Sequence, residues 1–100
     1  MNSKKKITYK SFDVADHLED REVIIQYLNT VLEEGDAADL VLALSDVSRA
    51  IGMSKIAEST GMSRPSLYKA LAPNARPQFN TILKVLRAIG GNLSIVPSKQ

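Results

Sequence analysis

Residues 53–71 read MSKIAESTGMSRPSLYKAL, and this stretch decides the fold. Ala57 is small enough for a second helix to cross close to the first. Gly61 supplies the left-handed backbone conformation that a tight turn after a helix needs. Ser63 follows at once and can cap the next helix by accepting a hydrogen bond from a backbone N–H. The stretch therefore predicts two short helices, about 53–60 and 64–71, joined by a turn.

The second of these helices is expected to have an apolar inner face and a polar outer face. Leu67 and Leu71, four residues apart, anchor the inner face, and Met62 fills the corner between the helices. The outer face carries Arg64, Ser66, Tyr68 and Lys69. A helix that displays basic and hydrogen-bonding side chains suits the major groove of DNA. The pattern predicts a helix-turn-helix with 64–71 as its recognition helix; the alternative is an ordinary helical corner with solvated residues.

The rest of the chain also favours helices. Asp20 is a candidate N-cap for a helix that ends at Gly35, and Asp36 caps a second one that ends at Gly52. Apolar residues recur at helical spacing in the first of these, at Val23, Ile24, Tyr27, Leu28, Val31 and Leu32. A last helix, about 78–89, has a stripe at Phe79, Ile82, Leu83, Leu86 and Ile89. The sequence predicts an all-α bundle of five short helices, with an extended tract at 7–12 and a short strand at 92–96.

Composition limits the classes of protein that fit. One hundred residues, 44% of them hydrophobic and 24% charged, suit one globular domain. The absence of cysteine excludes disulfide scaffolds, thiolate zinc sites and a cysteine nucleophile. No stretch is apolar enough to span a membrane, and the basic start lacks a signal-peptide core. We expect a cytoplasmic protein with no membrane partner and no cofactor.

Charge is strongly segregated along the chain. The net charge of +2 combines +4 over residues 1–12, −9 over 13–48 and +7 over 49–100. Blocks of opposite sign in one short chain indicate two partners, one basic and one acidic. The alternative is that each block is only a solvated helix face.

Catalysis would have to use His17, the only histidine, with the nearby carboxylates of Asp13, Asp16 and Asp20. This cluster lies in a poorly periodic region that offers no other ligand and no apolar wall to shift a pKa. The chain also lacks a phosphate-binding glycine loop and a nucleophile motif. We expect that the protein is not an enzyme.

A wider pattern now links these features to known families. Residues 36–89 resemble the phage-repressor-type (XRE/Cro-C1) helix-turn-helix fold. An N-terminal YKSFD tract at residues 9–13, the repressor-like core and a GGNL sequence at 90–93 follow one another in this order. That order resembles the HigA-like addiction-module antidote family, antitoxins encoded beside a small toxin of the RelE/ParE type. The resemblance covers roughly residues 8–97.

The resemblance implies which residues touch DNA. Those that match base-contacting positions of the repressor fold are Arg64, Ser66, Tyr68 and Lys69. Ser54 and Ser63, at helix N-termini, match positions that meet phosphates. Met53 stands where many such repressors carry a glutamine that contacts the DNA backbone, so Lys55 is expected to take over that contact. Pro65 can add only shape and apolar contact.

The resemblance also gives the acidic block a partner. RelE/ParE-type toxins are small and basic, so the acidic segment is a fitting counter-surface. The tract at 7–12 could add a strand to an exposed sheet edge of the toxin. The implied toxin-binding residues are Tyr9, Phe12, Asp13, Asp16 and Glu19. In the alternative, Tyr9 and Phe12 fold back on the core of their own chain.

The resulting prediction is an antitoxin with two functions. Residues 1–35 would bind and mask the toxin, and residues 36–97 would bind the operator of its own operon. The operator-binding form is expected to be a homodimer, with the last helix and residues 93–96 as its interface. The C-terminal strand would pair with its two-fold mate or with residues 7–9. The alternatives are a stand-alone repressor without a toxin, and an interaction module that has lost DNA binding.

Overall fold

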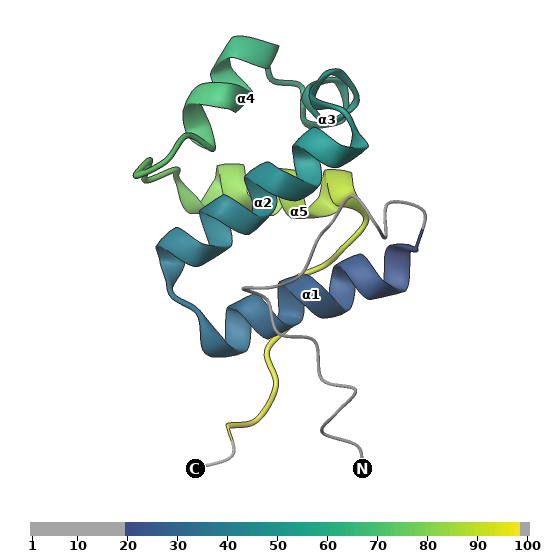
Figure 1. Ribbon diagram of the computed structural model, residues 1–100, viewed down its shortest axis with the longest axis vertical. Helices are drawn as coiled ribbons and strands as arrows, with labels where there is room; N and C mark the ends of the chain where they lie inside the picture. The colour runs from purple at the N-terminus through teal and green to yellow at the C-terminus, as the bar shows by residue number, and fades with distance from the viewer. Residues whose placement is uncertain (1–19, 99–100) are drawn as a thin grey trace.

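The computed structural model describes residues 20–98 and builds them from five α-helices (Figure 1). In chain order these are α1 (Arg21–Glu34), α2 (Ala37–Ile51), α3 (Met53–Thr60), α4 (Arg64–Ala70) and α5 (Phe79–Ile89). Helix α2 is central because it packs against α1, α3 and α5, while α4 packs on α3. The predicted all-α class and the five helices are confirmed, with boundaries within about a residue of those expected.

Acidic side chains set where the first two helices begin. The Asp20 carboxylate accepts a hydrogen bond from the Val23 N–H over 3.2 Å. At the start of α2, Asp36 accepts from the Asp39 N–H at 2.9 Å, and Asp39 accepts from the Asp36 N–H at 3.0 Å. Such a reciprocal pair satisfies backbone donors that have no partner inside the helix. Part of the acidic block therefore serves local structure.

A single hydrophobic core joins all five helices. Helix α1 contributes Ile24, Tyr27, Leu28 and Val31. Two residues of the predicted apolar stripes are not in this core, since Phe79 is 64% exposed and Leu32 is 42% exposed. Both lie at a helix end, Phe79 as the first residue of α5 and Leu32 in the last turn of α1, where no described helix covers them. The division into a toxin-binding segment, 1–35, and an operator-binding segment, 36–97, stays a prediction.

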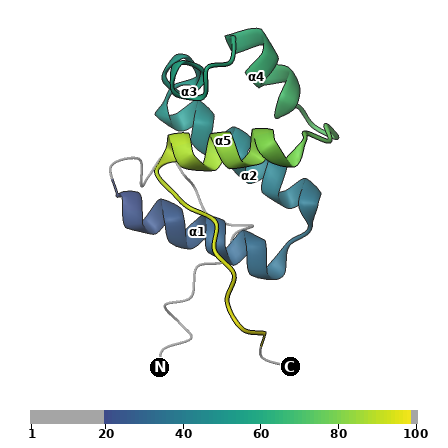
Figure 2. The ribbon, with the colours of Figure 1, turned by 180° about the vertical axis from the view of Figure 1, so that it is seen from behind.

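The predicted C-terminal strand is wrong for the described part of the chain, which contains no strand. Gly90 ends α5 with a left-handed φ of 112°, and the chain then runs extended across α1 (Figure 2). A strand needs a hydrogen-bonded neighbour, and none of the described residues provides one for residues 92–96. The tract at 7–12 lies outside the described residues.

The hydroxyl of Ser48 is an unsatisfied polar group in this core. Ser48 is fully buried on α2, and its Oγ has no hydrogen-bond partner among the described residues. Burial of a hydroxyl without a partner costs roughly 1–3 kcal/mol. We expect Ser48→Ala to raise the unfolding free energy by about 1 kcal/mol, measured by urea denaturation.

Alanine also has the higher helix propensity, so this prediction needs a control. Ser59→Ala makes the same change at an exposed position of α3. An equal gain in both variants would mean that propensity alone stabilises the chain, and that the Ser48 hydroxyl carries no penalty.

Candidate nucleic-acid interface

The turn between α3 and α4 has the backbone geometry that the sequence predicted. Gly61 is left-handed, with φ 77° and ψ 12°, and its N–H donates to the Glu58 carbonyl over 3.3 Å. The next N–H, of Met62, donates to the Ala57 carbonyl at 3.1 Å and to Thr60 Oγ1 at 3.2 Å. These bonds satisfy the last carbonyls of α3 and direct the chain into α4.

Helix α4 begins at the predicted cap. Ser63 Oγ accepts from the Ser66 N–H at 3.2 Å and donates to Ser66 Oγ at 2.9 Å. Pro65 stands in the first turn, where its missing N–H removes no helical hydrogen bond. On the inner side, Leu67 and Leu71 are buried in the core as expected. The inner side thus fixes how α4 is oriented on the molecule.

All of the predicted DNA-contacting residues are exposed on the α3–α4 unit. The exposed positions are Ser54, Lys55, Ser63, Arg64, Pro65, Ser66, Tyr68 and Lys69. Met53 is only 5% exposed. Met53 is the first residue of α3, and its thioether packs in the core, so it is not available for a contact at the surface.

Sequence reasoning missed Arg49, which the structure places at this surface. The Arg49 Cζ lies 5.5 Å from the centroid of the Tyr68 ring, and the Arg64 Cζ lies 5.7 Å from it. Both distances allow a cation–π interaction, so one ring holds guanidinium groups from α2 and α4. The available signal was the place of Arg49 in the last turn of α2, just before α3 begins.

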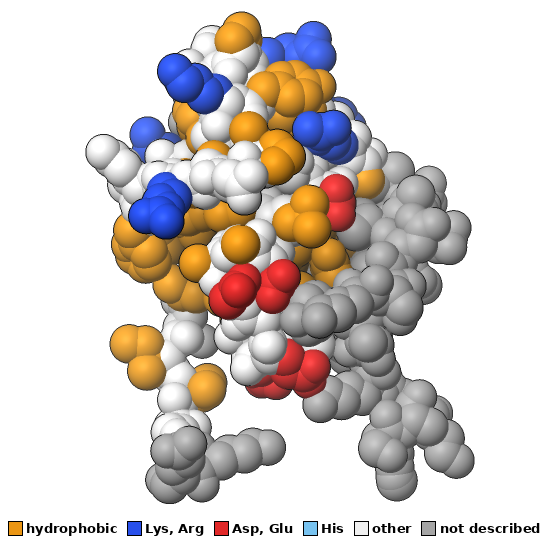
Figure 3. Space-filling model, turned by 60° about the vertical axis from the view of Figure 1, so that its left-hand side comes forward, with side chains coloured by type: hydrophobic (Ala, Val, Ile, Leu, Met, Phe, Trp, Pro, Cys, Tyr) orange, Lys and Arg blue, Asp and Glu red, His pale blue; other side chains and the backbone are white. Residues whose placement is uncertain are grey.

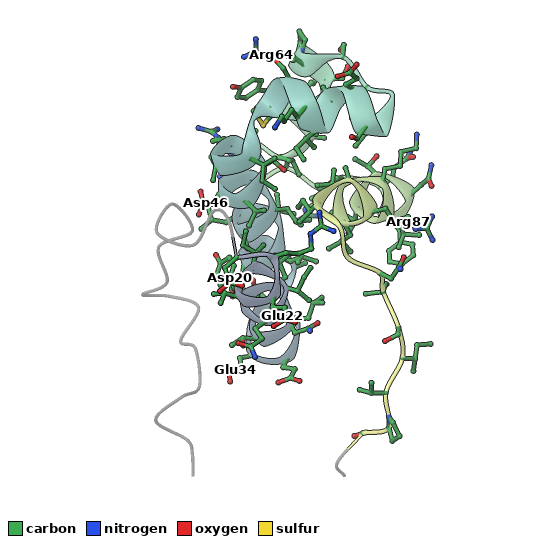
Figure 4. The ribbon with its side chains drawn as sticks, turned by 90° about the vertical axis from the view of Figure 1, so that its right-hand side faces the viewer. Asp20, Glu22, Glu34, Asp46, Arg64 and Arg87 are labelled. Atoms are coloured by element: carbon green, nitrogen blue, oxygen red, sulfur yellow. The ribbon has the colours of Figure 1, made fainter. Side chains whose placement is uncertain are left out.

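Arg64 and the acidic residues of α1 labelled in Figure 4 lie at opposite ends of the molecule. Arg64 is at one end, while Asp20, Glu22 and Glu34 are at the other, with Asp46 in between (Figure 4). The space-filling view shows the same separation, with basic side chains above the acidic ones (Figure 3). Sign segregation in the sequence is therefore also segregation in space, and a polyanion would meet the α4 end most favourably.

Asp46, an acidic side chain of α2, lies near Arg49 and has a shifted pKa. Partial burial raises the pKa of its carboxyl above the ordinary value of 3.8, and the nearby Arg49 guanidinium opposes that rise. The folded chain thus binds this proton more tightly than the unfolded chain. Protonated Asp46 therefore stabilises the folded chain. This stabilisation is complete at pH values below the ordinary pKa, and it is lost as the pH rises through the raised pKa of the folded state.

We therefore expect Asp46→Asn to stabilise the fold slightly at pH 7, by less than about 1 kcal/mol because the side chain is largely exposed. At pH 3 the gain should disappear, because both side chains are then neutral. Urea denaturation at the two pH values measures the difference in unfolding free energy. Glu58→Gln, at an exposed position of α3, is the control. A less stable Asp46→Asn variant at pH 7 would show that attraction to Arg49 outweighs burial.

The expected toxin-binding residues Tyr9, Phe12, Asp13, Asp16 and Glu19 lie outside the described residues, as does His17. Within residues 20–98, no group of histidine, aspartate and glutamate side chains could hold a metal ion. No helix in that range is long and apolar enough to cross a membrane.

Comparison with known proteins gives this chain a family. A family model described as "probable addiction module antidote protein" matches residues 8–97, and the chain belongs to that family. An uncharacterised protein of Haemophilus influenzae is 42% identical over 90 residues, which are 90% of this chain and 93% of the relative. No solved structure matches the chain. Membership of an antidote family indicates an antitoxin role with a toxin as partner, and antidotes of this kind are in general not enzymes.

Proposed function

We propose that the protein is the antitoxin of a type II toxin–antitoxin module and also represses its own operon. In this proposal α3 and α4 form a phage-repressor-type helix-turn-helix of the HigA-like kind, and α4 enters the major groove. A homodimer binds the operator in the cytoplasm. The N-terminal segment masks a small basic toxin of the RelE/ParE type.

The observation that carries the DNA-binding part is the composition of the exposed α4 surface. Arg64 lies at the N-terminal end of α4 and Lys69 one turn later, both exposed. Arginine can donate two hydrogen bonds to guanine O6 and N7, and lysine can neutralise a phosphate. Only Glu58 adds a negative charge to residues 49–100, so little repulsion opposes a polyanion there.

The stacking on Tyr68 supports the same proposal. Two guanidinium groups within 6 Å of one ring centroid repel each other, and an anion between or beside them relieves that repulsion. Arg49 thus extends the proposed interface beyond the helix-turn-helix to the end of α2. Its role would be to bind a phosphate while Tyr68 holds both arginines in place.

The acidic end of the molecule supports the toxin-binding part. Asp20, Glu22 and Glu34 lie at the end away from Arg64, so a basic protein could bind there while α4 faces DNA (Figure 4). Binding at opposite ends lets one chain serve both partners at once.

Co-purification tests the proposal directly. The tagged chain is expressed with its neighbouring reading frames, and a high-salt wash removes partners held by weak charge attraction. We expect a basic protein of similar size to co-elute, and the complex to bind the DNA upstream of the operon. Recovery of this chain alone, still bound to that DNA, would indicate a stand-alone repressor. A toxin complex without DNA affinity would contradict the repressor part.

Deletion of residues 1–12 separates the two functions. We expect the affinity for the toxin to fall by roughly tenfold or more through loss of the tract with Tyr9 and Phe12, while operator affinity changes little. Both are measured by titration of the shortened chain. An unchanged toxin affinity would mean that this tract makes no contact with the toxin.

A further inference from the structure

An apolar groove lies between the last turn of α1, the start of α2 and the first turns of α5. It encloses about 700 Å³. A second hollow of about 380 Å³ adjoins it, because Leu32, Leu86 and Leu93 line both. Figure 3 shows apolar side chains gathered below the basic end of the molecule, with acidic side chains next to them. An open apolar surface of this extent marks a site for a partner.

Three large apolar side chains stay exposed on this surface. Phe79 is 64% exposed, and Leu32 and Leu93 are each 42% exposed. All three line the groove. A partner that covers them would remove apolar area from water and gain binding free energy at each. The three come from α5, α1 and the segment after α5, so such a partner would contact both ends of the described chain.

Acidic residues surround the same surface. Residues 33–36 read EEGD and place three carboxylates at the corner between α1 and α2. Asp36 lines the groove and Glu33 lines the second hollow, while Arg76 is the basic residue among the described lining residues of the two. Acids therefore outnumber bases there. A partner with basic side chains beside an apolar face complements this surface.

The walls of the groove decide which kind of segment fits it. They are helices, whose backbone groups are mostly hydrogen-bonded within each helix, so they offer side chains and no edge to which a strand could be added. An amphipathic helix binds a groove of this kind through apolar side chains spaced along one face.

We propose that the groove binds an amphipathic helix of the toxin. Its apolar face packs on Phe79, Leu32 and Leu93, and its lysine or arginine side chains lie beside Asp36 and Glu33. The inference rests on the proposed function, because it takes the basic toxin as the partner. It goes further by placing part of the toxin contact within residues 36–97, which the sequence assigned to the operator alone.

The charges favour the toxin over another copy of this chain as the occupant. In a symmetric contact through this surface each copy would bring its own acidic corner, and like charges repel. A basic partner brings the opposite charge. None of the described lining residues of the groove belongs to α3 or α4, so a toxin seated there leaves the proposed DNA-contacting side chains open.

Truncation of Phe79 tests the apolar contact. The full chain is titrated with the basic protein that co-elutes with it, and Phe79→Ala should weaken the complex by roughly tenfold or more. Leu42→Ala is the matched control, since Leu42 is 57% exposed but lines neither the groove nor the second hollow. Both side chains are exposed, so both variants keep the fold, which circular dichroism verifies.

Reversal of one charge tests the acidic corner. Glu33→Lys should weaken the complex by roughly tenfold at low salt, and this loss should shrink as salt screens the repulsion. The loss in Phe79→Ala should persist at high salt, because apolar contact is not screened. Glu58→Lys makes the same change at an exposed position of α3 and is the control. Equal losses in the two lysine variants would mean that only overall charge matters, which would contradict the acidic corner as a contact.

Protection of an introduced cysteine locates the contact. The chain has no cysteine, so a single one reports on its own position. Ala37 is exposed and lines the groove, and Ala37→Cys should react with a maleimide in the free chain and become protected in the complex. Leu42→Cys should react at the same rate in both. Protection of Ala37→Cys in the free chain that disappears on dilution would assign the groove to a second copy and overturn the inference.

The two proposals fail in different ways. An unchanged toxin affinity in Phe79→Ala, with the deletion of residues 1–12 still weakening the complex, would overturn the groove as a toxin site and leave the antitoxin function in place. If no basic protein co-elutes with the wild-type chain, the proposed toxin partner is refuted, and this inference with it.

Discussion

Replacement of Arg64 and Lys69 by alanine should weaken operator binding by roughly 100-fold. One bidentate arginine–guanine contact discriminates by about 1–3 kcal/mol, and a lost phosphate contact adds to that. The dependence of affinity on salt should also become less steep, because fewer counterions are released. Toxin binding should not change, since the acidic end lies away from Arg64. Fluorescence anisotropy with the upstream DNA at several salt concentrations measures these effects.

The control removes the same charge elsewhere. Lys84 and Arg87 are exposed on α5, and Figure 4 shows Arg87 well away from Arg64. If Lys84→Ala with Arg87→Ala weakens binding equally, only overall charge matters and α4 is not a recognition helix. Simultaneous loss of DNA and toxin binding in the Arg64 and Lys69 variant would contradict the separation of the two functions.

Of the substitutions considered, Leu67→Ala should lower the free energy of unfolding the most. Leu67 is fully buried and is the buried residue of α4, so its truncation leaves a cavity under this helix. Leucine-to-alanine changes in cores cost about 2–5 kcal/mol, which is a large share of the roughly 5–15 kcal/mol that stabilises a domain. Urea denaturation measures the loss. Operator affinity should fall as well, because α4 loses its main anchor.

Leu42→Ala is the comparison for this experiment. It deletes the same atoms from a side chain that is 57% exposed, where the expected change is within about 1 kcal/mol. A cost below about 1 kcal/mol for Leu67→Ala would show that α4 is held by its turn and cap rather than by its buried side chain.

Local rules made most of the fold predictable. Asp20, Asp36 and Ser63 are caps whose side chains hydrogen-bond a backbone N–H three residues later, and the structure has those bonds. Gly61 takes the left-handed conformation that its place between two helices requires. Such signals depend on neighbours in sequence, and one chain contains all of them.

The features that could not be predicted depend on residues distant in sequence or on a partner outside the chain. Alternating residues at 92–96 favoured a strand, but a strand forms only against a partner. Phe79 has the helical spacing of a buried residue, but it is the first residue of α5, where no described helix packs over it. Arg49 joins the Tyr68 cluster because the fold brings the last turn of α2 to within 5.5 Å of the Tyr68 ring on α4, which no local pattern encodes. The binding roles of the predicted site residues remain predictions.

The single core has a consequence for how long the protein survives in a cell. Ile24 and Val31 of α1 are in the same core cluster as Leu67 of α4. A small domain with one core unfolds as a unit, so a protease that pulls on either end would unfold the whole chain. Under the proposed function, no operator-binding remnant would outlive the toxin-binding segment. Repression and neutralisation would therefore cease together, and the lifetime of one folded unit would set the timing of both.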